Sequence, residues 1–238
     1  FSIEKNRKTS SDELGVDAQD TDAFALLVNS KLSDAMQLKA ELTGSWTQAE
    51  YSYDDDWSYP GIATGWEYKA YDQYLRNNDR ISADVKLLSG SDGRIFSNSS
   101  DWVVGLYVLQ REEDLTRNYE YIPSEFESTL KTSSTAIYSE LGTDLTDSVR
   151  IITGLRIENW ISDYDDNNQV EGKVDEVLVG GKITLESMLS LNHLAYASLA
   201  RGYKAGGINT NPDISEKNRE FSAELNNTLE LGLKSSML

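Results

Sequence analysis

The stretch SLARGYKAGGIN, residues 198–209, places Arg201, Tyr203 and Lys204 among three glycines. Cations beside glycines are typical of loops that bind phosphate, because glycine lets the backbone approach the anion closely. The spacing does not fit such a loop, since the chain contains neither G-x-x-x-x-G-K-[ST] nor G-x-G-x-x-G. Lys and Arg number 22 against 40 Asp and Glu, a formal net charge of -18. That excess of carboxylates also argues against a nucleic-acid partner, which would need a broad cationic face.

An acidic stretch, SDYDDNNQVEG, raises the question of a calcium site. Asp163, Asp165 and Asn167 stand at the offsets of the first three ligands of an EF-hand loop. The sixth position is Asn168 rather than Gly, and the twelfth is Val174 rather than Glu. A solvated loop is therefore the preferred interpretation, and a weak calcium site is the alternative.

Other residues that could do chemistry are few. Asp54 to Asp56, in YSYDDDW, could pair carboxylates as a glycosidase does, or simply begin a solvated loop. His193 is the only histidine and there is no cysteine, so zinc sites, Ser-His relays and thiol nucleophiles lack their usual ligands or bases. Neither G-x-S-x-G nor H-E-x-x-H occurs. We expect no enzyme, no metal and no cofactor.

The elements that position these residues show a two-residue period, which is typical of β-strands. In residues 149–157 the odd positions are mainly apolar, whereas the even ones include Arg150, Gly154 and Arg156. The same alternation predicts nine strands, at residues 22–31, 36–54, 79–89, 100–112, 130–143, 147–161, 173–185, 191–204 and 221–234.

The connections are expected to alternate in length. Most of those on one side are short (32–35, 90–99, 144–146 and 186–190), and those on the other are long (55–78, 113–129, 162–172 and 205–220). This asymmetry is typical of membrane barrels with antiparallel up-and-down strands, in which a strand crosses the hydrocarbon in roughly 9–11 residues. The sequence therefore predicts an all-β fold, an arc of a transmembrane β-barrel. The chain lacks an initial Met and ends within an alternating segment, so we expect a fragment of a longer protein.

Two segments then suggest a family. LAYASLARGYKAGGIN, followed by FSAELNNTLELGLKSSML, resembles the paired barrel segments of TonB-dependent outer-membrane receptors. The matching residues are Tyr196, Ala197, Ser198, Arg201, Gly202, Tyr203, Lys204, Gly206, Gly207, Asn209, Glu224, Glu230, Leu231, Gly232, Leu233, Lys234 and Ser235. The sequence departs from the family pattern at Ala200, Ala223 and Leu229. The stretches LTGSWTQAEYSYDDD, GRIFSNSSDWVVGLYVLQRE and TAIYSELGTDLTDSVRIITGLRIE also resemble the family and follow in its order, so the resemblance spans about residues 22–238.

The resemblance implies a fold and a function. The family barrel has 22 strands and a plugged lumen, so residues 22–238 are expected to form part of the barrel domain and residues 1–21 a loop segment entering it. The implied protein is a receptor in the outer membrane of a Gram-negative bacterium. It would take up a scarce ligand, first of all a ferric siderophore, with energy from the TonB system acting on a plug outside this chain. A passive porin and a soluble, acidic β-rich binding module are the alternatives, and outer-membrane lipid is an expected partner.

Residue types in the two matching segments suggest roles. Gly202, Gly206 and Gly207 would let the strand bend out of the sheet. Lys204 and Arg201 would reach lipid headgroup level. Glu224, Glu230 and Lys234 would share the face that lines the lumen. Aromatic residues near several expected strand ends are interpreted either as an interfacial girdle or as ordinary strand residues; they are Trp46, Tyr51, Tyr53, Trp102, Trp160 and Tyr203.

Overall fold

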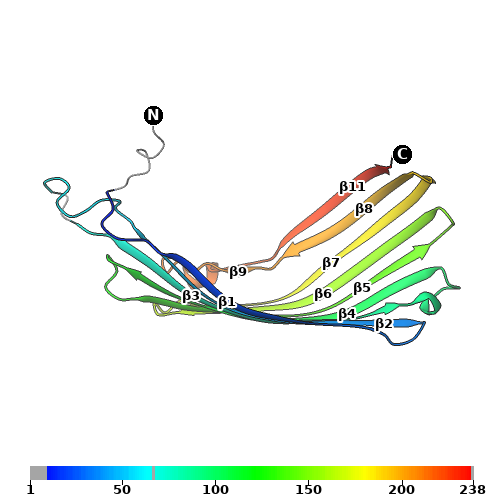
Figure 1. The fold of residues 1–238 in the computed structure, drawn as a ribbon, viewed down its shortest axis with the longest axis horizontal. Helices are drawn as coiled ribbons and strands as arrows, with labels where there is room; N and C mark the ends of the chain where they lie inside the picture. The colour runs from blue at the N-terminus through cyan, green and yellow to red at the C-terminus, as the bar shows by residue number, and fades with distance from the viewer. Residues whose placement is uncertain (1–9, 66–67, 237–238) are drawn as a thin grey trace.

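A computed structural model describes residues 10–65 and 68–236 as one curved antiparallel sheet of nine strands (Figure 1). Eight of the nine strands follow one another in chain order and the ninth, β11, pairs with β8. The strands are β1 (Asp17–Lys31), β2 (Met36–Asp54), β3 (Tyr71–Ser89), β4 (Ser100–Tyr119), β5 (Phe126–Asp144), β6 (Val149–Asp166), β7 (Glu171–Ser190), β8 (His193–Lys204) and β11 (Glu224–Ser235). The predicted all-β, up-and-down fold is thereby confirmed.

The remaining elements are short. Two-residue strands β9 (Gly207–Ile208) and β10 (Glu220–Phe221) pair with each other, and single 3-10 turns occur at η2 (Ser91–Gly93) and η3 (Glu216–Asn218). Among the residues that the structure describes, no helix combines the length and the hydrophobicity that crossing a membrane requires.

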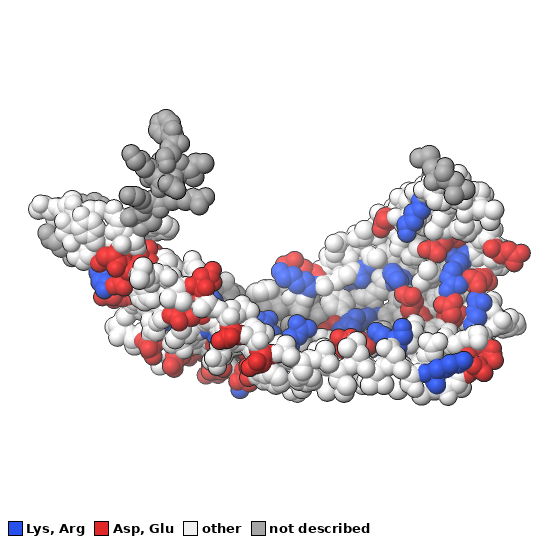
Figure 2. All heavy atoms as spheres, viewed as in Figure 1, with Lys and Arg blue, Asp and Glu red and all other residues white. Residues whose placement is uncertain are grey.

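The two faces of the sheet differ in chemistry. The convex face carries a band of exposed apolar side chains in the middle of the strands, for example Leu106 at 50% exposure opposite Ile137 at 56%. Lys and Arg side chains gather with Asp and Glu in the hollow of the sheet, whereas further Asp and Glu side chains lie on the convex side toward the left end in Figure 2. We call the hollow side the inner face and the convex side the outer face. Few described residues are fully buried, so the sheet is not packed around a central apolar core.

The strands extend well beyond the ends that alternation predicts. β3 begins at Tyr71 rather than 79, and β4 continues to Tyr119 rather than 112. The long connections predicted at 113–129 and 162–172 are wrong, because only residues 120–125 and 167–170 link the strands there. Apart from Leu75 on β3, most outward positions in these extensions are polar. The hydrophobic period therefore ends while the backbone ladder, which does not depend on side-chain polarity, continues.

The aromatic residues lie in different places. Trp46 is on the outer face, 47% exposed, and its ring stacks on Phe24 with centroids 5.9 Å apart. Tyr53 instead donates a hydrogen bond to Asp72 on the inner face. Trp102 donates its indole N–H to the carbonyl of Gly93 in the loop before β4. A single interfacial girdle is therefore the wrong interpretation for Tyr53, whereas Trp46 has the outward position that a girdle needs.

Adjacent leucines on β1 offer a matched test of the two faces. Leu26 pairs with Leu42 and Leu27 pairs with Glu41, and the two leucines are 57% and 63% exposed. If the outer face contacts hydrocarbon, Leu26→Arg lowers the free energy of unfolding by about 2–4 kcal/mol. Leu27→Arg, beside a carboxylate on the inner face, has a much smaller effect. Urea unfolding of the complete barrel in lipid vesicles measures both, and equal effects would contradict the assignment of the faces.

Candidate functional site

The inner face is joined across strands by ionic and tyrosine contacts. The hydroxyl of Tyr138 on β5 donates to Asp84 on β3, at 2.8 and 2.9 Å from its two oxygens. Arg156 on β6 lies 5.2 Å from the centre of the Tyr107 ring on β4. Such contacts link strands that are distant in sequence and fix the orientation of long side chains. The inner face is thus a structured polar wall.

The family-like residue Tyr203 enters this wall. Its hydroxyl donates to Glu158 at 2.6 Å, and Arg156 Nε donates to the Tyr203 oxygen at 3.1 Å and to Glu158 at 2.9 Å. Glu158 is only 7% exposed, and Ser134 also donates to it. A carboxylate this buried needs such partners to stay ionised. Tyr203 therefore attaches the end of β8 to the middle of the inner wall.

The paired strands β8 and β11 place further motif residues on the same face. Tyr196 donates to Glu230 at 2.5 Å, and the ammonium of Lys234 lies 5.3 Å from the centre of the Tyr196 ring. Ser198 shares a hydroxyl hydrogen bond of 2.8 Å with Thr184 on β7. A Cβ at Gly232 would come within 2.3 Å of the Tyr196 ring, so a larger residue at this position would displace that ring.

The segment 205–222, between β8 and β11, folds back over the inner face, where β9 is visible in Figure 1. One carboxylate holds both of its ends: Gly206 N and Ala223 N donate to the two oxygens of Glu176 at 3.0 and 3.1 Å. Asn209 N donates to the carbonyl of Arg219 at 2.8 Å, which closes the middle of the segment. Glu176 is thus the anchor of this segment.

The glycines and charged residues of the motif near this segment differ in how closely other atoms surround them. A Cβ at Gly206 would come within 2.2 Å of a backbone oxygen, and one at Gly207 within 2.6 Å of the Phe221 ring. Gly202 has open space around it, so close packing does not explain glycine there. Lys204 and Glu224 are both largely exposed and lie 3.7 Å apart. An exposed pair of this kind contributes little to stability.

A second cluster lies on the inner face beyond the level of the apolar band. Arg117 donates two hydrogen bonds to the carboxylate of Asp72, at 2.9 and 2.7 Å. Tyr53 and Tyr74 donate to the same carboxylate at 3.1 and 3.0 Å. The Arg117 guanidinium also lies over the rings of Tyr74 and Tyr119, at 5.0 and 4.9 Å. We call Tyr53, Asp72, Tyr74 and Arg117 the tyrosine–arginine cluster.

The environment of the tyrosine–arginine cluster shifts its pKa values. Burial opposes ionisation of Asp72, which is 1% exposed, but hydrogen bonds from Arg117, Tyr74 and Tyr53 outweigh it and lower the pKa of this carboxyl. Burial and the hydrogen bond to Asp72 raise the pKa of Tyr53 to about 12. The cluster thus holds one carboxylate, one guanidinium and two neutral phenols at neutral pH. Sequence reasoning missed it, although tyrosine and acid alternate in YSYDDD and YDQY.

The acids considered for catalysis or calcium binding have structural contacts instead. Asp54 is 5% exposed and accepts hydrogen bonds from the backbone N–H groups of Asp12, Asp56 and Trp57. Asp55 and Asp56 accept hydrogen bonds from Tyr119 and from Ser58. Across the described parts of the chain, no group of three or more His, Cys, Asp or Glu residues could hold a metal ion.

In the EF-hand-like stretch, Asp163 and Asp165 pair with Lys131 and Thr129 within the β5–β6 ladder. The following residue, Asp166, caps the turn by accepting from Asn168 N and Val170 N. His193 lies at the start of β8, where its ring shares a 2.8 Å hydrogen bond with Ser235. Asp166 thus caps a turn, and His193 joins the paired ends of β8 and β11.

Comparison with known proteins places this geometry in a family. The model of a family described as TonB dependent receptor-like, beta-barrel, matches residues 3–238. The pesticin receptors of Yersinia pestis and Yersinia enterocolitica are 27% identical over 202 residues, which cover 76% of this chain. The same alignment covers 29% of each receptor, so the chain spans less than a third of the length of these relatives.

Solved structures agree on the fold. The ferric yersiniabactin uptake receptor FyuA from Yersinia pestis superposes with a TM-score of 0.74 at 20% identity, over 92% of this chain and 34% of that one. The ferric-catecholate import receptor Fiu from E. coli K12, in its closed form, gives 0.71 at 16% identity, over 96% and 40% of the two chains. At these identities the likeness establishes the arrangement of strands alone.

The pH response of the tyrosine–arginine cluster can be predicted. The folded pKa of Asp72 lies below that of an unfolded Asp, about 3.9. Its stabilising contribution is therefore complete above about pH 4 and is lost as pH falls through the lowered pKa. Near-UV circular dichroism from the tyrosines should stay constant from neutral pH to about 4 and decrease below it. Asp72→Asn should lack this transition, whereas Asp55→Asn, on the exposed pair with Tyr119, should keep it. A transition that survives in Asp72→Asn would contradict the assignment.

The anchor of segment 205–222 is also testable. Glu176→Ala removes the acceptor of both Gly206 N and Ala223 N, so limited proteolysis within 205–222 should become several-fold faster. Asp175→Ala is the matched control, because Asp175 is an exposed neighbouring acid whose side chain has no described partner among residues 10–65 and 68–236. Equal cleavage rates in the two variants would show that Glu176 does not anchor the segment.

Proposed function

Because this chain belongs to the family of TonB-dependent receptor-like β-barrels, we propose that it forms part of a receptor for the uptake of a ferric siderophore across the outer membrane. The observation that carries the proposal is the family match over residues 3–238 on a sheet with an apolar outer and a polar inner face. We infer that the sheet from Asp17 onward supplies an arc of a 22-stranded barrel. The expected loop boundary at residue 21 is too late, because Asp17 to Thr21 already pair with β2.

The outer face supports a place in the membrane. Within hydrocarbon every backbone polar group needs a partner, which a continuous antiparallel ladder supplies. The exposed apolar band would then contact acyl chains, and the polar extensions of β3 to β7 would rise above the lipid into the medium. Leu229, Leu231 and Leu233 on β11 are 64–74% exposed, which is costly in water and favourable in lipid.

The inner wall supports a lumen that holds another folded part of the protein. Arg156, Glu158 and Lys182 are directed inward from β6 and β7, and Lys182 pairs with Glu140 at 2.7 Å. Such a wall provides polar contacts for a plug that must detach when the TonB system acts on it. No bond of the ligand is made or broken in this mechanism, and we assign no catalytic residue to the chain.

The ligand class is proposed from the relatives and from the tyrosine–arginine cluster. FyuA and Fiu are described as receptors for ferric yersiniabactin and for ferric catecholates. Arg117 and Arg76 both lie over the Tyr74 ring, about 5 Å from its centre. Aromatic rings and guanidinium groups on the inner face, above the level of the lipid, suit the binding of an anionic or aromatic metal chelate. The loops 55–70 and 120–125 next to this cluster are the expected contact region.

Uptake of radioactive iron tests this function. Cells that carry the complete receptor should accumulate iron-55 from its ferric siderophore, and deletion of the receptor gene should reduce accumulation to the background level. Removal of TonB should have the same effect, because release into the periplasm depends on energy. A passive porin would give uptake that is independent of TonB and proportional to concentration. TonB-independent accumulation, or no change on deletion, would contradict the proposal.

A further inference from the structure

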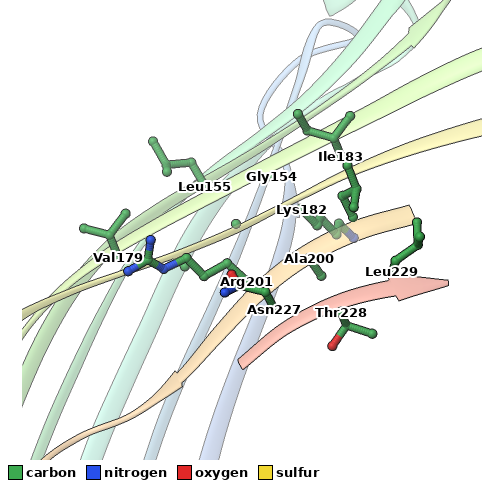
Figure 3. Close-up of a pocket in the computed structure, with 13 residues that line it drawn as sticks. Gly154, Leu155, Val179, Lys182, Ile183, Ala200, Arg201, Asn227, Thr228 and Leu229 are labelled. Carbon is green, nitrogen blue, oxygen red and sulfur yellow. The ribbon is translucent and has the colours of Figure 1, made fainter. Parts of the chain in front are cut away.

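A shallow groove crosses the outer face where β6, β7, β8 and β11 lie side by side (Figure 3). Its outward side chains are mostly apolar and half exposed; they are Leu155, Val179, Ile183, Leu199 and Leu229, at 42–66% exposure. Ala200 and Lys182 are directed to the opposite side of the sheet in Figure 3. The groove therefore belongs to the surface that we propose faces lipid, and it is distinct from the inner wall.

Gly181 forms the floor of this groove. It stands between Leu155 on β6 and Arg201 on β8 in the strand register, in a row where its neighbours carry large side chains. A Cβ at Gly181 would lie 2.7 Å from the backbone oxygen of Gly154, so a side chain cannot be added without moving the sheet. The depression is thus a fixed property of the backbone and does not depend on side-chain rotamers.

Arg201 lies at the end of the groove. It follows the outward apolar residues Ala197 and Leu199 along β8, although Leu225 on β11 lies beyond it. Leu199 and Leu229 pair across β8 and β11, and the next outward pair toward the ends of 205–222 is Arg201 with Asn227. In Figure 3 the Arg201 side chain extends along the sheet toward Val179. It is exposed, and within the described parts of the chain it makes no hydrogen bond or ion pair. A guanidinium in this position can reach the headgroup level of the leaflet.

The charge around Arg201 differs from that at a second outward hollow, which lies near the edge of the apolar band. That second hollow, beside Trp46, is lined by the carboxylates Asp79, Glu112 and Asp163. Its outward cation, Lys131, is paired with Glu112 at 3.4 Å. In a chain with a net charge of -18, the groove at Arg201 combines an apolar floor with an unpaired cation and no lining carboxylate. Its chemistry is complementary to a lipid that bears a phosphate.

We propose that this groove binds one phosphate-bearing lipid of the outer leaflet, with an acyl chain over Gly181 and the phosphate on Arg201. The inference rests on the membrane position in the proposed function and adds a specific lipid site to it. A planar guanidinium can donate two parallel hydrogen bonds to a phosphate. The apolar side chains Leu155, Ile183 and Leu199 would cover the acyl chain and exclude water from it. A free phosphate ion would use only the arginine, so the groove favours the lipid.

Native mass spectrometry of the complete receptor tests the site. The receptor in detergent is incubated with bis-phosphorylated lipid A, or with the same lipid after removal of its phosphates. The mass spectrum of the wild-type receptor should contain a species with one phosphorylated lipid bound. Arg201→Gln should retain it at least fivefold less, because a lost charge-assisted hydrogen bond changes binding by about tenfold. Lys131→Gln is the matched control, an outward cation at the same edge whose loss should not alter retention. Heat-modifiable mobility in gels verifies that each barrel is folded.

Each outcome bears on a different claim. Equal retention by Arg201→Gln and the wild type, or equal retention of the dephosphorylated lipid, would overturn the site while leaving the membrane receptor intact. Displacement of the lipid by millimolar inorganic phosphate would also overturn it, because it would assign Arg201 to a soluble anion. A receptor that is soluble without detergent and retains no lipid would instead contradict the proposed function.

Discussion

The structure depends on the requirement that backbone N–H and C=O groups be paired where no water is present. From β1 to β8 and on to β11, each strand of the main sheet is paired with the next one. β7 pairs with β8 only from Gly181 to Ser190, with one register irregularity between Met188 and Ser190. Because the ladder provides hydrogen-bond partners for the backbone N–H and C=O groups, the side chains on the two faces can differ completely in polarity. The apolar outer band and the ionic inner wall are both consequences of that freedom.

The inner wall derives its order from contacts between strands. Glu158 binds Ser134 from the preceding strand and Tyr203 from a strand two positions away, and Arg156 binds both Glu158 and Tyr203. A group so connected is costly to rearrange, because removing one partner leaves a buried charge unsatisfied. The moving parts of a gated receptor would then be the contents of the lumen and the segments at its rim, such as 205–222 on its Glu176 anchor.

The sequence predicted much of the fold and less of the site. Period-two alternation located all nine long strands, because each of them crosses the apolar band. Within that band the outward side chains are mostly apolar and the inward ones mostly polar. It failed for the upper ends of β3 to β7, where outward residues such as Asp114 and Thr129 are polar and the pattern disappears. The motif residues from Tyr196 to Lys234 were identified by resemblance, but the hydrogen bond from Tyr203 to Glu158 joins β8 to β6 across 45 positions and has no local signal. The contact of Asp72 with Arg117 joins residues 45 positions apart, and local spacing carries no signal for it.

The central claim is that one face of this sheet contacts lipid and the other lines a lumen. The chain has no cysteine, so single cysteines can be introduced along residues 149–161 of β6 and labelled with a nitroxide in the complete receptor in vesicles. The account predicts that collision with oxygen, which concentrates in lipid, is high at 151, 155 and 157 and low at 150, 154 and 156. A flat profile, or strong collision with a water-soluble nickel chelate at 155 and 157, would contradict it.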